Sequence, residues 1–186
     1  MIYSTIKSEK FPKLGLGLMR HNPNNFSSIK TNIEYALSNG LNYFETAYFY
    51  LEYKSEKYLG DILSNYPRNE YKICAKLPVM GILPQRNSPY FIFKDQLENF
   101  KVDYFDIYLL QALDSRAFPF IEKYKLLEFI SDIKNNGKAK LVGFSFHDTP
   151  EILEKYLNMY DWDVVQLQLN YYDWYIGYGK ELYNLC

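Results

Sequence analysis

The sequence predicts an α/β fold built from parallel strands, and two observations carry that prediction. Short apolar runs recur along the 186 residues, and each is followed by a segment with helical periodicity. The strand–helix units repeat about every 30 residues, a length that suits right-handed crossovers between parallel strands. Two architectures fit this alternation: an open doubly wound sheet and a closed (β/α)8 barrel of the TIM type.

Three strand–helix units are predicted in the first half of the chain. Strands are expected at the apolar runs 14–19, 41–47 and 71–77. Helices are expected in the segments that follow, at 28–38, 55–64 and 90–100. Gly40 follows the first helix, where a left-handed residue ends many helices, and Pro78 ends the third strand.

The second half of the chain repeats the pattern. Strands are expected at the apolar runs 104–110, 140–146 and 164–169. Helices are expected at 121–135, from about 149 onward, and at 178–186. Gly137 ends the first of these helices. Asp148 or Thr149 can cap the second, and Pro150 suits its first turn.

Polar residues at the ends of the predicted strands favour the barrel, because active-site residues of barrel enzymes occupy such positions. They are Glu45, Lys76, Gln111, Ser145 and Asn170. A nucleotide-binding doubly wound fold would usually show G-x-G-x-x-G after its first strand, but Gly15-Leu16-Gly17 continues into Leu18-Met19-Arg20. Periodicity alone leaves both architectures open.

Five sequence segments, in order, resemble strands of the aldo-keto reductase family. Residues 40–50, GLNYFETAYFY, resemble the family's N-Y-F-D-T-A-x-x-Y, and S-E and L-G follow at 55–56 and 59–60. The other segments are YKICAKLP at 71–78, DYFDIYLL at 103–110, GKAK and GFSFH within 137–147, and WDVVQLQLNY at 162–171. The nearest resemblance is to a bacterial subgroup that often carries a C-terminal iron–sulfur segment.

This resemblance covers nearly the whole chain and implies an incomplete (β/α)8 barrel with about six β/α units. Residues 1–186 would form one domain that lacks the last two units. A complete barrel of this type needs about 250 residues. The missing part would hold two strands and residues that grip the adenosine phosphate, and the subgroup's cysteine cluster is absent from the sequence.

The resemblance also implies the chemistry, which is NADPH-dependent reduction of a small-molecule carbonyl to an alcohol. Tyr50 would be the general acid. A tyrosine is a weak acid at neutral pH, and Lys76, held by Glu45, would stabilise its phenolate form. Glu45 stands where the family usually has aspartate, and Gln111 where it usually has histidine. A glutamine amide can donate a hydrogen bond to a carbonyl oxygen but cannot carry a proton charge.

Cofactor contacts are implied for Ser145 and Gln166, with Asn170 as a further position. In the family the serine and the glutamine bind the nicotinamide carboxamide. The alternative is that a Ser or Gln at a buried strand end satisfies backbone groups nearby. His147 is assigned to a loop outside the site.

Composition limits the other function classes. The formal net charge of -1 argues against non-specific binding of nucleic acid, which calls for a clustered basic surface. No signal peptide and no membrane-spanning run is evident. Two cysteines, Cys74 and Cys186, do not indicate a disulfide framework, so a reducing, cytoplasmic location is expected.

Three hypotheses remain open from the sequence. The chain is a truncated carbonyl reductase, a non-catalytic relative that acts as a binding or scaffold protein, or a subunit that a partner completes. Six parallel strands without closure leave the first and last with open edges, which favour an oligomer or aggregation.

Overall fold

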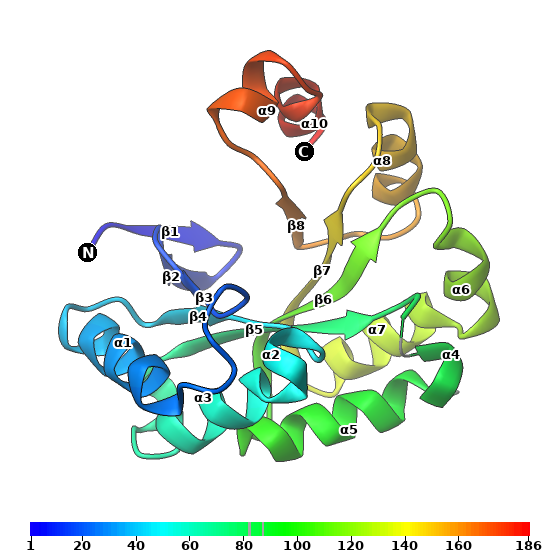
Figure 1. Ribbon diagram of the computed structural model, residues 1–186. Coiled ribbons are helices and arrows are strands. Elements are labelled where there is room, and N and C mark those ends of the chain that lie inside the picture. The colour runs from blue at the N-terminus through cyan, green and yellow to red at the C-terminus, as the bar shows by residue number, and fades with distance from the viewer. Residues whose placement is uncertain (82, 87) are drawn as a thin grey trace.

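The computed structural model describes residues 1–81, 83–86 and 88–186, and its centre is one curled sheet of six parallel strands (Figure 1). The strands pair in chain order. They are β3 (Leu16–Gly17), β4 (Tyr43–Glu45), β5 (Lys72–Pro78), β6 (Phe105–Leu113), β7 (Ala139–Phe146) and β8 (Val164–Leu167). This is the predicted α/β architecture, a half-barrel of about six units. Within the part of the chain that is described, β3 and β8 do not pair with each other.

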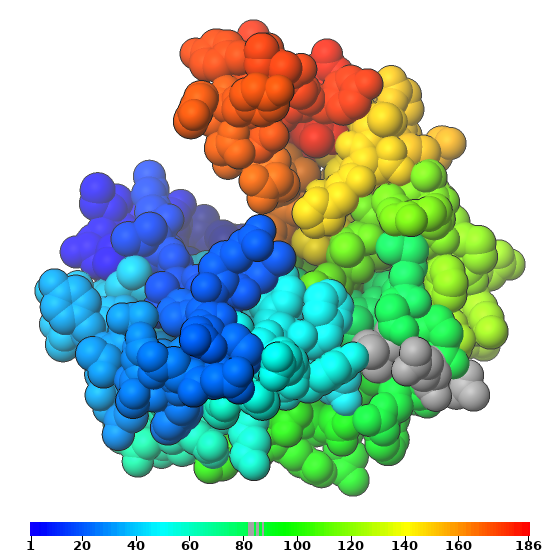
Figure 2. All heavy atoms as spheres, in the orientation of Figure 1, coloured from blue at the N-terminus to red at the C-terminus, as the bar shows by residue number. Residues whose placement is uncertain are grey.

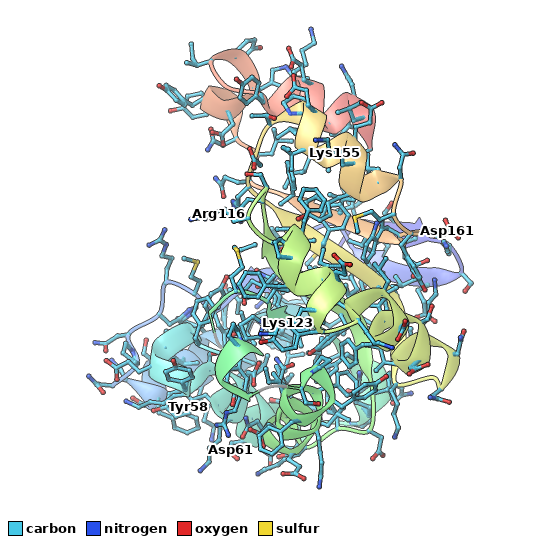
Figure 3. The ribbon with its side chains drawn as sticks, turned by 90° about the vertical axis from the view of Figure 1, so that its right-hand side faces the viewer. Tyr58, Asp61, Arg116, Lys123, Lys155 and Asp161 are labelled. Carbon is cyan, nitrogen blue, oxygen red and sulfur yellow. The ribbon has the colours of Figure 1, made fainter. Side chains whose placement is uncertain are left out.

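The helices mostly cover the outer face of the sheet. They are α1 (Phe26–Ser38), α2 (Tyr50–Tyr53), α3 (Ser55–Leu63), α4 (Leu83–Arg86), α5 (Pro89–Phe100), α6 (Phe118–Lys123), α7 (Leu126–Asn135), α8 (Pro150–Leu157), α9 (Tyr171–Tyr175) and α10 (Gly179–Leu185), with a 3-10 turn at Arg68–Glu70. Of these, α9 and α10 lie beyond the end of β8 (Figure 1). Figure 3 looks onto the layer formed by α6 to α8, with Lys123 and Lys155 on its surface. In the described ranges, none of these helices is long and apolar enough to cross a membrane.

Two helix ends were predicted correctly from glycines, whereas one helix break, at a lysine, was not predicted. Gly40 and Gly137 have φ of +76° and +68°, as predicted for residues that end helices. The single helix predicted over 121–135 is wrong. Lys125 takes a left-handed φ of 50° and separates α6 from α7.

Two apolar layers hold the sheet. The larger lies between the sheet and its helices and contains edge-to-face ring pairs such as Phe93 with Tyr108, with centroids 4.9 Å apart. The smaller lies on the inner face and contains Phe11, Cys74, Ile107, Leu109 and Leu141. Because strand residues alternate between the two faces, this inner layer consists of every second residue of β5, β6 and β7.

A hairpin that the sequence analysis did not anticipate closes one end of the inner face. It consists of β1 (Tyr3–Ile6) and β2 (Glu9–Pro12), which pair antiparallel. Phe11 is buried and meets the Tyr43 ring edge-to-face, with centroids 5.5 Å apart. The hairpin therefore covers the end of the sheet where the parallel strands begin.

A buried ion network lies at the same end. Asp106 is fully buried; its carboxylate lies 2.7 Å from the Arg68 guanidinium and 3.1 Å from Lys72 Nζ, and it accepts a hydrogen bond from the backbone N–H of Ile73. Lys72 also pairs with Glu9 of the hairpin at 2.7 Å. A buried carboxylate is tolerated when it is paired and hydrogen-bonded in this way.

The sheet is open between its N-terminal and C-terminal segments. Figure 2 shows a hollow between the N-terminal segments in blue and the C-terminal segments in orange and red. All four residues of β8 are only half-buried. Tyr171, Tyr175 and Ile176 near the C-terminus expose 83%, 81% and 70% of their surface. The C-terminal segment therefore exposes several large, mainly apolar side chains.

Candidate active site

Strand alternation places the predicted site residues on the inner face, beyond the inner apolar layer. Each of them follows a residue of the inner layer on the same strand by two or four positions, so both side chains point inward. All lie at or near the C-terminal end of a strand; they are Glu45, Lys76, Gln111, Ser145 and Gln166. They line one pocket of about 430 Å³ together with Tyr50. Carboxyl ends of parallel strands are where barrel enzymes carry their chemistry.

Three of these residues are in direct contact. Lys76 Nζ forms an ion pair with Glu45 Oε1 and lies 3.5 Å from the hydroxyl oxygen of Tyr50. The Lys76 side chain is 5% exposed and that of Glu45 19%. The pairing of β4 with β5 sets this geometry, because Glu45 lies opposite Cys74 and Lys76 follows two residues later on the same face.

The ion pair keeps the lysine charged. Burial on its own lowers the pKa of Lys76, but the charge of Glu45 and the hydrogen bond to it outweigh the burial, so the pKa is raised. An ammonium therefore faces the Tyr50 hydroxyl throughout the neutral pH range.

A left-handed turn directly follows Tyr50. Leu51, Glu52 and Tyr53 have φ of 52°, 56° and 67°, although none is glycine. Each such residue costs about 1–2 kcal/mol relative to an ordinary backbone conformation. Strain of this kind persists only where surrounding structure holds it, and Leu51 is buried in the outer apolar layer.

A bulge near the end of β6 shapes the next part of the pocket. The register of β6 against β7 shifts between Leu110 and Leu113, and Ala112 has a φ of 56°. The backbone N–H of Ala112 donates to Ser145 Oγ at 2.8 Å. Ser145 therefore satisfies a backbone group, which was the alternative to cofactor binding in the sequence analysis. It also lines the pocket.

Two side-chain amides in the pocket have buried oxygens without partners. Within the described residues, Oε1 of Gln111 and Oε1 of Gln166 are buried and accept no hydrogen bond. A buried acceptor without a donor costs about 1–3 kcal/mol. Both side chains line the pocket, although these two oxygen atoms are themselves shielded from solvent.

Asn170 lies apart from this group. Its side chain accepts hydrogen bonds from the backbone N–H groups of Tyr172 and Asp173, at 2.8 and 3.1 Å, and so caps α9. It is exposed and does not line the pocket. A cofactor contact by Asn170 stays a prediction.

The pocket contains residues that sequence reasoning passed over. His147 lines it, although the sequence placed this residue in a loop outside the site, and Arg20, Phe49 and Gln168 line it as well. These residues follow strand ends, as the predicted ones do, but no spacing marks them. Arg20 makes no ion pair with any residue that the structure describes.

A second hollow, of about 450 Å³, lies on the outer surface around α6 and α7. It is lined by apolar residues such as Phe118, Ile121 and Met159, with Glu and Lys side chains at its rim. Its charged pair, Lys125 with Glu128 at 3.5 Å, is exposed to solvent, whereas the Lys76–Glu45 pair of the inner pocket is mostly buried. The candidate chemistry therefore belongs to the strand ends.

Comparison with known families shows which family the chain belongs to. A family model described as the aldo/keto reductase family matches residues 13–181. The chain belongs to the aldo/keto reductase family.

Solved aldo-keto reductases share its fold. A thermostable aldo-keto reductase in complex with the inhibitor epalrestat aligns with a TM-score of 0.75 at 19% identity, over 91% of this chain and 63% of that one. The Klebsiella pneumoniae aldo-keto reductase in complex with NADPH gives 0.70 at 20% identity, over 87% and 55%. The holo form of an aldo-keto reductase from Bacillus halodurans gives 0.72 at 21% identity, over 91% and 58%. The chain thus spans less than two thirds of each relative.

Side chains that bind metals do not gather in the part of this aldo-keto reductase that the structure describes. Residues 1–81, 83–86 and 88–186 hold no group of three or more His, Cys, Asp or Glu side chains placed to bind a metal. Cys74 is buried in the inner layer, where burial raises the pKa of its thiol to about 12, and Cys186 is exposed.

Proposed function

We propose that this chain carries the catalytic centre of an NADPH-dependent carbonyl reductase, with Tyr50 as the general acid. The observation that carries the proposal is the contact of Tyr50, Lys76 and Glu45 inside one pocket at the carboxyl ends of the strands. Membership of the aldo/keto reductase family supports the same reaction class.

In the proposed reaction, the Tyr50 hydroxyl donates its proton to the carbonyl oxygen while a hydride adds to the carbonyl carbon. NADPH, when bound, supplies that hydride. The Lys76 ammonium, 3.5 Å from the Tyr50 oxygen, stabilises the phenolate that remains, and solvent returns the proton. Glu45 holds the ammonium in place through the ion pair.

The two departures from the usual family residues are compatible with this scheme. Glu45 is one methylene longer than aspartate and still reaches Lys76. Gln111 would orient the carbonyl through its amide N–H group rather than transfer a proton. The acid role therefore falls on Tyr50 alone.

The pocket also fits a nicotinamide carboxamide. The side-chain amides of Gln111 and Gln166 line it, and an amide can exchange hydrogen bonds with the carboxamide, which offers two N–H donors and one acceptor oxygen. We assign the carboxamide contact to Gln166, with the Ser145 hydroxyl beside it, since β7 and β8 pair these two residues directly.

The substrate is proposed to be a small carbonyl compound that bears an anionic group. Among the charged residues that line the pocket, Lys76 and Glu45 neutralise each other, which leaves the Arg20 guanidinium as an unbalanced positive charge. Guanidinium groups bind carboxylates through paired hydrogen bonds. A keto acid or an aldehyde with a carboxylate fits this lining.

Two measurements test the proposal. NADPH titrated into the purified chain should quench its tyrosine and tryptophan fluorescence with a micromolar Kd. Tyr50→Phe should lower the kcat of carbonyl reduction at least about 100-fold while leaving that Kd within about twofold. Turnover that is unchanged in the variant refutes the assignment of the acid.

A second proposal concerns completion of the barrel. We infer that further β/α units, from the same or another polypeptide, cover the free edges of β3 and β8, because the matched relatives are longer and the C-terminal aromatic side chains are exposed. Light scattering on the purified 186-residue chain tests this inference. A monodisperse monomer that resists aggregation at high concentration contradicts it.

A further inference from the structure

The backbone that carries Lys76 lacks a strand neighbour on one side. β4 ends at Glu45, opposite Cys74, and the backbone N–H of Thr46 still donates to the Cys74 carbonyl oxygen at 3.1 Å. Carbonyl groups two residues apart on a strand point the same way, so the Lys76 carbonyl faces the region just beyond the end of β4. There it accepts a hydrogen bond from Gln96 Nε2 of α5, at 3.0 Å.

The Gln96 amide is itself fixed from both sides. Tyr108 donates its hydroxyl hydrogen to Gln96 Oε1, and Gln96 Nε2 donates to Glu56 Oε1, each at 2.5 Å. Because the Lys76 carbonyl oxygen can only accept, the amide nitrogen is directed toward Lys76 and Glu56, where both of its hydrogens are used, and the amide oxygen faces the Tyr108 hydroxyl. Gln96 and Tyr108 are fully buried, and Glu56 is 1% exposed.

The residue next to Glu56 holds the neighbouring strand end. Ser55 accepts a hydrogen bond from Thr46 Oγ1 at 2.8 Å and donates to the Ala47 carbonyl oxygen at 3.2 Å. The first turn of α3 thus contacts the segment after Glu45 directly and the Lys76 backbone through Gln96. One helix end sets the separation of the two strand ends whose side chains form the ion pair.

We propose that Gln96 is a positioning residue of the reductase site, which replaces the missing strand neighbour of Lys76 and so fixes the ammonium against Tyr50. This role rests on the proposed function, since it requires Lys76 to act on Tyr50. Gln96 touches neither substrate nor cofactor. It acts only through the main chain of Lys76.

Gln96→Met tests the role, because methionine has a similar volume and no donor. We expect kcat for carbonyl reduction to fall about 10- to 100-fold, since a misplacement of about 1 Å costs that much, while the KM for the carbonyl changes less than about twofold. Amide hydrogen exchange at residues 74–77 should accelerate in the same variant. Tyr108→Phe keeps the hydrogen bond to Lys76 but frees the amide oxygen, and its effects should be smaller.

A second variant distinguishes a specific effect on the position of Lys76 from a general loss of stability. Ile130→Val removes a methylene from the buried outer layer, away from the pocket, and should leave both kcat and exchange at 74–77 unchanged. The proposal is overturned if Gln96→Met keeps the wild-type kcat, or if exchange at 74–77 is unaltered. If the wild-type chain reduces no carbonyl, the proposed function fails, and the exchange measurement alone still decides whether Gln96 holds the Lys76 backbone.

Discussion

Glu56 gives this fold a stability that declines as pH rises. Burial raises the pKa of this carboxyl to about 8, although hydrogen bonds from Gln96 and Asn99 lower it in part. Among the described residues it has no ion pair to offset the burial. The folded chain therefore binds a proton on Glu56 at neutral pH, whereas the unfolded chain, with an ordinary carboxyl, has released it.

The sign and the magnitude follow from this difference. Below the ordinary pKa of 4.5 both states hold the proton, and the stabilisation from Glu56 is fully present. Between 4.5 and about 8 only the folded state holds it, and each pH unit lowers the free energy of unfolding by about 1.4 kcal/mol. Over the whole interval the loss amounts to about 5 kcal/mol, and it levels off above the folded-state pKa.

Glu56→Gln removes the titration and keeps the shape. We expect the free energy of unfolding of the variant, relative to wild type, to rise by about 4 kcal/mol between pH 5 and pH 8, measured by urea denaturation with circular dichroism. Glu154→Gln, a change on the exposed face of α8, serves as the control and should show a pH-independent offset. A Glu56→Gln offset that is constant within about 1 kcal/mol across this range would refute the reasoning.

Other substitutions test the sheet, the turn and the pocket. Gly143→Ala should lower the free energy of unfolding by about 2–3 kcal/mol in urea titrations, because the added Cβ would overlap the Val164 carbonyl oxygen and push β8 away; an unchanged urea midpoint would argue against the tight β7–β8 contact. Glu52→Gly should raise the midpoint, with a gain of up to about 1 kcal/mol, by relieving one left-handed residue; a lowered midpoint would contradict the strain. Arg20→Gln should raise the KM about fivefold for an aldehyde that bears a carboxylate but not for its methyl ester, and equal effects on both would exclude an anion contact.

The sequence predicted those elements of the fold that depend on a short stretch of residues. Apolar runs predicted all six parallel strands, and Gly40 and Gly137 marked helix ends because only glycine takes that conformation without strain. The hairpin of β1 and β2 was missed because its turn, with Lys7 at a φ of 51°, contains no glycine or asparagine. The break between α6 and α7 was missed for the same reason, since Lys125 carries no turn signal.

The site was predictable only in part. Resemblance pointed to Tyr50, Lys76 and Glu45, which the fold brings into contact, but no pattern pointed to Gln96. A glutamine on a helix is usually exposed to solvent, so nothing in the sequence placed Gln96 near the site. Its contact with Lys76 depends on the end of β4, which the sequence did not predict to the residue. His147 and Arg20 were passed over because loop conformation decides whether such residues enter a pocket.

The anchoring residues and the pocket residues lie at opposite ends of this sheet. The hairpin and the Asp106 network anchor the end where the strands begin, far along each strand from the residues of the pocket. An exchange of Glu45 for aspartate or of Gln111 for histidine therefore touches none of the anchoring charges. The residues that line the pocket and the residues that anchor the sheet are thus two separate sets at opposite ends of the strands.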